Sequence, residues 1–257
     1  MKLSYLRTIA QYWNATSAEY CNSHPEHLRR DMHPSWGMWN IPERDLGLLR
    51  DYLLPGKDLI ELGCGQGHNA VGFAEHELNV LGVDVSREQL SRAIGHPGVK
   101  YVLSPAERIP AQDGSVDIVT SDHGAFDYSP PKLLLQEVAR VLKPGGVLAF
   151  CTFSPIAYTC FDQGSGTLGE RLVNDYPSNL FYYDGSITSS QMSYSSWVTM
   201  IHSFGFSILR LEELLAPSGS PSYFNELVSA EWGTRWPLEI AWLIQKNAES
   251  RDMVPVP

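Results

Sequence analysis

The sequence predicts an α/β fold, in which an open and mostly parallel sheet carries helices on both faces. Short apolar runs alternate with segments of helical periodicity, which favours strands joined by helical crossovers. Gly63, Gly65 and Gly67 follow the first strongly apolar run directly, and the next apolar run ends on Asp84. A glycine-rich turn and a carboxylate at these two places are typical of α/β proteins that hold a nucleoside.

The chain opens with apolar positions at helical spacing over residues 4–20, and a polar, histidine-rich stretch follows to about His33. A short helix is expected from about Pro42 to Leu53, because proline fits a first helical turn and several leucines form an apolar face. We assign residues 1–54 to an N-terminal helical lid and residues 55–257 to the main domain.

The main domain is expected to alternate strands and helices, which calls for a parallel sheet. Expected strands cover residues 58–62, 79–84, 100–103, 116–121 and 147–152, and expected helices cover 67–76, 86–95 and 131–142. A helix over 195–204 that ends at Gly205, with strands over 206–213 and about 237–245, would complete a sheet of seven strands.

An insertion after the fifth strand, at about residues 155–194, is rich in glycine, serine and aromatic side chains. An irregular segment of this length within a compact domain is typical of a lid or binding loop. Its aromatic residues point to an apolar pocket that accepts a ring, although core packing explains each single residue equally well. The tail over residues 253–257 reads as loose.

Composition excludes several classes of partner. The formal net charge is −10, and the 19 basic residues are dispersed, which opposes a nucleic-acid substrate. The four cysteines show no zinc spacing, so we expect no metal and a reducing compartment. The chain begins without a signal-peptide core and has no apolar run long enough for a membrane span, so we expect a cytoplasmic protein.

The glycine loop carries the ligand prediction. Without a Cβ, Gly63, Gly65 and Gly67 let the chain turn sharply and let a ligand lie against backbone N–H groups. Asp84 can accept hydrogen bonds from both ribose hydroxyls, although it could also serve only to cap the next helix. A dinucleotide fingerprint would place its third glycine where this chain has His68.

The loop has the form Glu-x-Gly-x-Gly-x-Gly from Glu61, and it resembles motif I of the class I S-adenosylmethionine-dependent methyltransferases. Residues 102–110, 114–121 and 134–148 resemble later blocks of that family in the same order. Segments 12–20, 33–39 and 235–242 look like a type-11-like subgroup of bacterial small-molecule methyltransferases. The resemblance implies a Rossmann-like, seven-stranded fold with S-adenosylmethionine as cofactor and S-adenosylhomocysteine as its product.

The resemblance also implies a set of cofactor-binding residues. Motif I supplies Glu61 and the three glycines, with Cys64 contributing backbone only, while Val85 and Gln89 would lie near the adenine beyond Asp84. Ala106 and Glu107 occupy the adenine positions, where Pro105 replaces a commonly acidic residue. Tyr20 and Trp36, with Tyr12 and Trp39, would fold over the sulfonium or else pack in the core. The remaining member of the set, Ser121, ends the fourth strand.

His123 follows the fourth strand, where the sheet edge should face the methyl group. An imidazole there can take a proton from the attacking hydroxyl or amine, which makes His123 the candidate general base. Asp122 and His33 are rivals for that role, and His123 could instead only line the pocket.

We therefore expect a methyltransferase that acts on an oxygen, nitrogen or carbon atom of a small molecule, as a monomer or homodimer. A nicotinamide-dependent oxidoreductase is the first alternative, because it shares the glycine loop and the carboxylate. A protein that binds S-adenosylmethionine without transferring its methyl group is the second.

Overall fold

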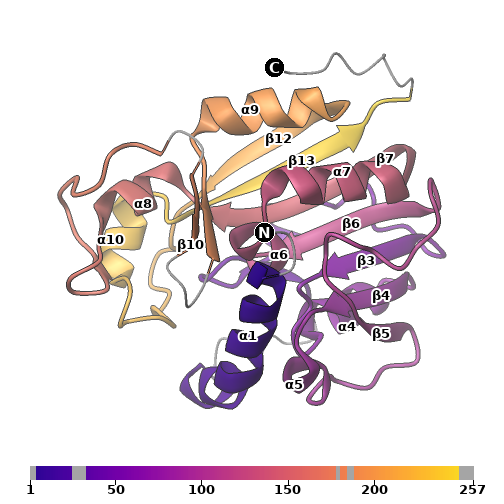
Figure 1. Cartoon of the computed structure of the whole chain (residues 1–257), viewed down its shortest axis with the longest axis horizontal. Helices are drawn as coiled ribbons and strands as arrows, with labels where there is room; N and C mark the ends of the chain where they lie inside the picture. Colours follow the sequence, from indigo (N-terminus) through magenta and orange to yellow (C-terminus); the bar gives the residue numbers. More distant parts are fainter. Residues whose placement is uncertain (1–3, 25–32, 178–179, 184–187, 249–257) are drawn as a thin grey trace.

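A seven-stranded sheet runs through the middle of the computed structural model, which describes residues 4–24, 33–177, 180–183 and 188–248 (Figure 1). The strand order is β12-β13-β7-β6-β3-β4-β5. Only β13 runs antiparallel to its neighbours. The strands are β3 (Asp58–Leu62), β4 (Asn79–Asp84), β5 (Val99–Leu103), β6 (Val116–Asp122), β7 (Leu142–Phe153), β12 (Phe206–Leu214) and β13 (Glu239–Lys246).

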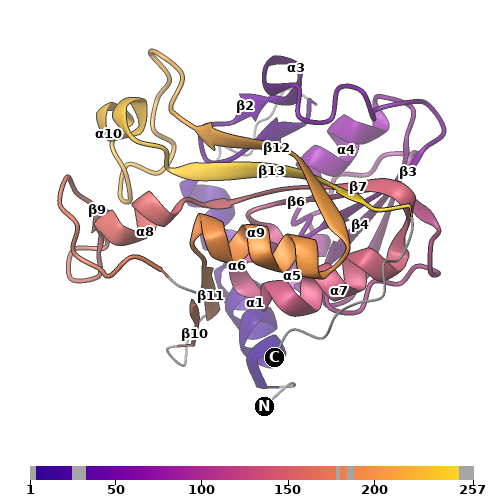
Figure 2. The same ribbon diagram turned by 90° about the horizontal axis from the view of Figure 1, so that it is seen from above.

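Helices cover both faces of this sheet (Figure 2). On one face α7 (Pro131–Val141) and α9 (Tyr194–Ser203) bury Leu134 and Trp197 against Phe150. On the other face α3 (Glu43–Leu46) and α4 (His68–Ala74) lie over a second core that includes Leu49 and Phe73. Because both faces are buried, the central strands are apolar on both sides instead of alternating.

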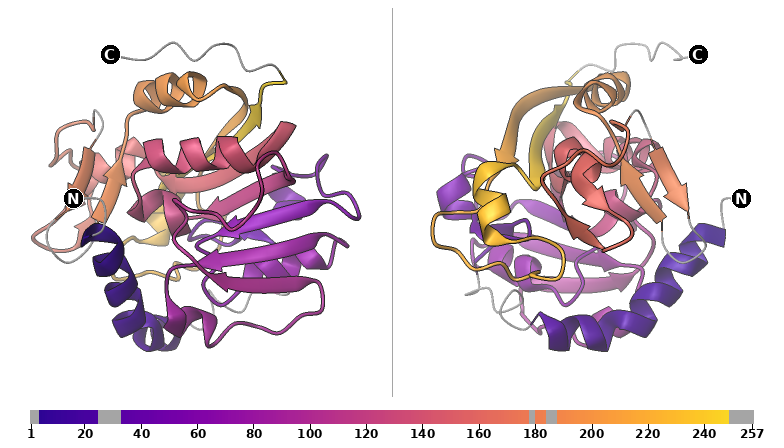
Figure 3. Two further views of the ribbon diagram at one scale, coloured as in Figure 1. Left: turned by 45° about the vertical axis from the view of Figure 1, so that its right-hand side comes forward. Right: turned by 90° about the vertical axis from the view of Figure 1, so that its left-hand side faces the viewer.

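Helix α1 (Ser4–Ser23) lies across the carboxyl ends of the parallel strands, well away from α9 (Figures 1 and 3). It is tied to the short helix α5 (Arg87–Leu90) by the Asn14 side chain. Asn14 Oδ1 accepts hydrogen bonds from Ser86 Oγ at 2.9 Å and from the Glu88 amide at 3.2 Å. No helix among the described residues has both the length and the apolarity needed to cross a bilayer.

Smaller elements surround the ends of the sheet, and a third apolar cluster with Trp39 and Trp232 lies among them. They are β1 (Ser35–Trp36), β2 (Ile41–Pro42), α6 (Gly124–Tyr128), α8 (Pro155–Cys160), β8 (Phe161–Asp162), β9 (Thr167–Leu168), β10 (Leu180–Tyr183), β11 (Thr188–Gln191) and α10 (Ala230–Arg235).

The structure confirms the predicted fold class, and three local predictions were wrong. The helix expected over 86–95 ends after Leu90, and beyond it the Ile94 amide bonds the Gln66 carbonyl at 2.9 Å instead of continuing the helix. The helix expected from about Pro42 to Leu53 ends after Leu46, because Gly47 adopts a left-handed φ of 63° and its amide closes the turn on Glu43. The insertion at about 155–194 is not irregular throughout, since it contains α8 and two short antiparallel strand pairs. The loose tail predicted at 253–257 lies outside the described residues.

Candidate functional site

A cavity of about 250 Å³ opens at the carboxyl edge of the sheet, between β3 and β6, where the strand order reverses. This is where open α/β sheets bind their ligands. Its walls come from the loops after β3, β4, β5 and β6, from α1 and from two later segments at Phe153 and Phe224.

The glycine loop forms one wall. The backbone φ angles of Gly63, Gly65 and Gly67 are positive, at 71°, 54° and 80°. Residues other than glycine rarely adopt such angles. A Cβ on Gly63 would come within 2.6 Å of the Gly124 backbone, so packing against α6 requires glycine there. A Cβ on Gly65 would meet only Gln89 Oε1, at 3.8 Å, because this residue faces the cavity.

Asp84 lies beside the loop at the end of β4, and it is 8% exposed. Its Oδ2 accepts the Gly65 amide at 2.8 Å, and its Oδ1 accepts the Ser86 amide at 2.7 Å. Burial raises the pKa of Asp84 above its usual range, and the amide hydrogen bonds only partly oppose the shift. Each carboxylate oxygen can accept more than one hydrogen bond, so Asp84 both fixes the loop and can receive ribose hydroxyls.

Most of the other predicted cofactor residues line the same part of the cavity. Glu107 is also hydrogen-bonded to α1, because its Oε1 accepts a hydrogen bond from the Tyr5 hydroxyl at 2.7 Å. This part of the wall, called the donor half below, consists of Glu61, Gly63, Cys64, Gly65, Asp84, Val85, Gln89, Pro105, Ala106 and Glu107.

Three predicted cofactor residues lie outside the described cavity wall. Gly67 is the N-cap of α4 and packs against the Tyr101 ring. Ser121 is fully buried, and its hydroxyl donates to the Leu62 carbonyl and accepts the Ala125 amide. Trp36 is 1% exposed in the core and donates its indole N–H to Glu43 at 2.6 Å. The structure thus gives these residues structural contacts beneath the wall.

His123 lies on the wall in a left-handed conformation, with φ of 55°, and it precedes α6. Its Nδ1 is 2.5 Å from Asp127 Oδ2, and its Nε2 is hydrogen-bonded to Glu239 Oε1. Asp127 also accepts the Thr152 hydroxyl, and Glu239 also accepts the Met38 amide at 2.7 Å. The ring is therefore held between two buried carboxylates that come from α6 and β13.

Charge, more than burial, sets the protonation of this ring. Burial lowers the pKa of His123, but the charges of Asp127 and Glu239 raise it more, so that the pKa lies well above the usual range. His123 is then an imidazolium at neutral pH, donating one N–H to each carboxylate. An imidazolium has no lone pair with which to take a proton, and this weighs against His123 as the general base.

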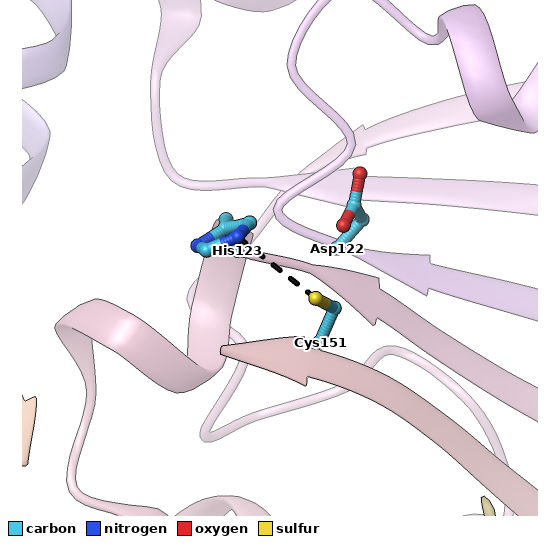
Figure 4. A group of neighbouring side chains, drawn as sticks. All are labelled: Asp122, His123 and Cys151. Carbon is cyan, nitrogen blue, oxygen red and sulfur yellow. Dashed lines mark hydrogen bonds between the residues drawn. The ribbon is translucent and has the colours of Figure 1, made fainter. Parts of the chain in front are cut away.

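The rival bases are placed very differently. Asp122 lines the cavity, and its Oδ1 accepts the Gly37 amide at 2.8 Å, whereas His33 is exposed and outside the described wall. Asp122, His123 and Cys151 lie close together, with ligand-type atoms within 4.8 Å, and Cys151 Sγ is directed at the His123 ring (Figure 4). Both ring nitrogens of His123 are hydrogen-bonded to Asp127 and Glu239, so we describe His123 as part of a carboxylate network.

Aromatic side chains form a large share of the remaining wall. The Trp13 ring packs edge-to-face against Tyr20 and Tyr128, with centroids 5.7 and 5.4 Å apart, and Phe153 packs against His123. Together with Asp122, His123 and Asp127, the residues Trp13, Tyr20, Met38, Tyr128, Phe153 and Phe224 make up what we call the acceptor half.

Sequence reasoning assigned the pocket aromatics to the insertion at about 155–194. Among the described residues, none of that insertion lines the cavity. Trp13 and Phe224 were missed. A signal for Trp13 was present, because Leu6, Ile9, Trp13 and Tyr20 recur on one face of a helix, and those four residues line the cavity.

The charges of the wall fit S-adenosylmethionine better than a nicotinamide dinucleotide. No lysine or arginine occurs among the described lining residues, so this part of the wall offers a pyrophosphate neither of the side chains that usually bind phosphates. Carboxylates at Glu61, Asp84 and Glu107 suit instead a ligand that carries a ribose, a sulfonium and an ammonium group.

Comparisons with known proteins find similarity to methyltransferases. Residues 60–150 match the family model described as "Methyltransferase domain". A demethylmenaquinone methyltransferase of Clavibacter sepedonicus is 30% identical over 156 residues, which are 56% of this chain and 64% of that protein. The chain spans about half to two thirds of the length of the first curated relatives it matches.

Solved structures share the fold at low identity. An S-adenosylmethionine-dependent methyltransferase from Mesorhizobium loti has a TM-score of 0.64 at 19% identity, covering 81% of this chain and all of that one. The 1,6-didemethyltoxoflavin-N1-methyltransferase of Burkholderia thailandensis, solved with S-adenosylhomocysteine, has a TM-score of 0.60 at 12% identity over 96% of this chain and 89% of its own. Residues 60–150 therefore match a methyltransferase domain, and they lie within a fold that solved S-adenosylmethionine-dependent methyltransferases share.

Proposed function

We propose that this protein transfers the methyl group of S-adenosylmethionine to a small molecule held in the acceptor half. One observation carries the proposal: the glycine loop, the Asp84 carboxylate and a ring-lined pocket meet in a single cavity at the switch point of the sheet. S-adenosylmethionine is the cofactor of the family and supplies an electrophilic methyl group when bound.

The chain contributes alignment and exclusion of water. Asp84 and the backbone of Gly65 hold the nucleoside end, while α1 lies over the cavity and contributes four apolar or aromatic residues to its wall. Placing donor and acceptor in one enclosed cavity converts a bimolecular reaction into one within a complex. Where the acceptor must lose a proton, we infer that a carboxylate of the acceptor half receives it instead of His123.

Isothermal calorimetry with S-adenosylhomocysteine is the direct test of the cofactor. We expect micromolar binding to the chain of 257 residues and a loss of about tenfold or more in the Asp84→Ala variant, since the ribose acceptor is removed. An Asp162→Ala variant changes an exposed carboxylate of β8 and serves as control, with unchanged binding. No heat of binding with the unaltered protein would exclude the proposal.

The transfer itself requires a second measurement. Mass spectrometry of a small-molecule pool incubated with protein and S-adenosylmethionine should show a product heavier by one methylene and an equal amount of S-adenosylhomocysteine. Tight cofactor binding with no methyl consumption from any accepted acceptor would favour the alternative of a binding protein. Preferential binding of a nicotinamide dinucleotide would favour an oxidoreductase.

A further inference from the structure

Carboxylates outnumber cations among the described residues of the acceptor half. Asp122 and Asp127 belong to its wall, and Glu239 lies directly behind it with no exposed surface. His123 is hydrogen-bonded to two of these carboxylates, Asp127 and Glu239. No lysine or arginine balances them among the described lining residues.

The charge of His123 is not available to a ligand. Both ring nitrogens are hydrogen-bonded to carboxylates, Nδ1 to Asp127 at 2.5 Å and Nε2 to Glu239. An imidazolium has only these two N–H groups, so no donor remains for a carboxylate or phosphate of an acceptor molecule. An anionic acceptor would therefore face Asp122 and Asp127 without a compensating partner, which is costly inside a protein.

The rings of the acceptor half favour the opposite charge. Trp13, Tyr20 and Tyr128 form a chain of edge-to-face contacts on the cavity wall, and Phe153 and Phe224 lie on the same wall. The negative face of an aromatic ring attracts a cation, and a combination of rings with carboxylates is a common way to hold an ammonium group. Apolar rings also accommodate a flat, apolar body next to that group.

We propose, on the basis of the function proposed above, that the methyl acceptor is a ring-bearing amine that enters as its ammonium ion. It gives one proton to a carboxylate of the acceptor half, so that its nitrogen lone pair can attack the methyl group and release S-adenosylhomocysteine. Glu239 determines this specificity without touching the acceptor, because it cancels the charge of His123 from behind the wall. Its second oxygen, Oε2, is buried and has no hydrogen-bond partner among the described atoms, so Glu239 contributes more negative charge than its hydrogen bonds to His123 and Met38 neutralise.

In this proposal the cavity holds two cations, the sulfonium of the cofactor and the ammonium ion of the acceptor. Each half of the cavity carries its own carboxylates. Glu61, Asp84 and Glu107 lie in the donor half, and Asp122 and Asp127 lie in the acceptor half. The negative wall reduces the repulsion that an ammonium acceptor would otherwise meet from the sulfonium of the cofactor.

The experiment measures binding of three probes of one shape to the protein saturated with S-adenosylhomocysteine. The probes are 2-phenylethylamine, 2-phenylethanol and 3-phenylpropionate, which are cationic, neutral and anionic at pH 7. We expect the amine to bind at least about tenfold more tightly than the alcohol, and the carboxylate to bind weakest. An amine that binds no better than the alcohol, or not at all, overturns the proposal.

Glu239→Gln tests the role of the buried Glu239 carboxylate. This change removes the negative charge that neutralises His123. The affinity for 2-phenylethylamine relative to that for 3-phenylpropionate should then fall by about tenfold, while S-adenosylhomocysteine binding persists. The matched control is Glu43→Gln, since Glu43 is also buried but bonds Trp36 and Leu49 outside the described wall. An unchanged ratio in Glu239→Gln contradicts the role of Glu239.

Asp122→Asn is a second variant, for the case that Glu239→Gln does not fold. It removes a charge of the wall by an isosteric change, and it should lower the ratio of amine to carboxylate affinity as well. The proposed function and the present inference can fail separately. If S-adenosylhomocysteine does not bind the unaltered protein, the proposed function fails. If it binds but the probes show no preference for the cation, only the present inference fails.

Discussion

Asp84 and Gly65 illustrate how single residues shape the proposed nucleoside site. The carboxylate fixes the loop by accepting the Gly65 amide, and the missing side chain of Gly65 leaves open space beside it. The sequence indicated both residues because their chemistry depends on local conformation, which a short motif encodes. The contacts of His123 were not predictable in this way, because Glu239 is 116 residues further along the chain.

Comparing Gly65→Ala with a control variant should distinguish a loss of ligand affinity from a loss of stability caused by backbone strain. The new methyl group meets no protein atom closely but occupies cavity space, so we expect S-adenosylhomocysteine affinity to fall by about tenfold or more. Gly56→Ala is the matched control, because Gly56 also has a positive φ, of 78°, and open surroundings. Both variants should lose about 1 kcal/mol of stability in denaturant unfolding. Equal affinity in the two variants would remove Gly65 from the cofactor site.

The ion pairs of Asp117 should make the free energy of unfolding depend on pH in the acidic range. Burial raises its pKa, but hydrogen bonds from Lys143 and Lys57 lower it more, so the folded pKa lies below the ordinary value of 3.8. The ion pair therefore stabilises the fold above pH 3.8, and this contribution disappears as the pH falls through the lower folded pKa.

Asp117→Asn should cost about 1 kcal/mol at pH 7 in urea unfolding, and the cost should shrink as the pH falls below 3.8. Asp113→Asn is the comparison, because the side chain of Asp113 is 80% exposed in its pair with Arg140 and should matter little. A loss for Asp117→Asn that stays constant down to pH 3 would show that packing, not charge, is involved.

At the scale of elements, α1 lies over the cavity and hydrogen-bonds both Glu107 of the donor half and the helix α5. Asn14 bonds α5 and Tyr5 bonds Glu107, while Leu6, Ile9 and Trp13 face the cavity. Helical periodicity predicted the helix itself, since local spacing reports which face is apolar. It could not report what that face covers, because the partners lie about 70 to 100 residues away in the chain.

Asn14→Ala should loosen this cover. The variant loses hydrogen bonds to Ser86 and Glu88, each worth about 1 kcal/mol, so the amides of α1 should exchange hydrogen faster and the cofactor product should dissociate about tenfold faster. Thr16→Ala, two residues on, removes only a bond to Tyr12 within the helix and should change neither rate. Unchanged dissociation in Asn14→Ala would mean that α1 does not gate the cofactor.

At the scale of the whole molecule, the cavity joins distant parts of the chain. α1 lies at one end of the sequence and Phe224 and Glu239 near the other, and the central strands lie between them. A ligand bound there contacts several segments at once, so it should stabilise the fold as a unit.

Scanning calorimetry should therefore show a single unfolding transition that moves upward with S-adenosylhomocysteine. At a free concentration of 100 times its Kd the ligand adds about 2.7 kcal/mol to the free energy of unfolding. Fluorescence of the tryptophans and far-ultraviolet circular dichroism should report the same midpoint. Two separated transitions, only one of which responds to the ligand, would show that the segments unfold independently.

The sequence by itself determined the fold class, the positions of the central strands and the glycine loop with Asp84. These features follow from hydrophobic periodicity and from turn chemistry, which act over a few residues. Only the tertiary structure decided which aromatic residues form the acceptor half, that Trp36 and Ser121 serve the core, and that His123 is held as a cation. Those outcomes depend on Asp127, Glu239 and α1 meeting at one edge of the sheet, and long-range contacts of this kind leave no local signal.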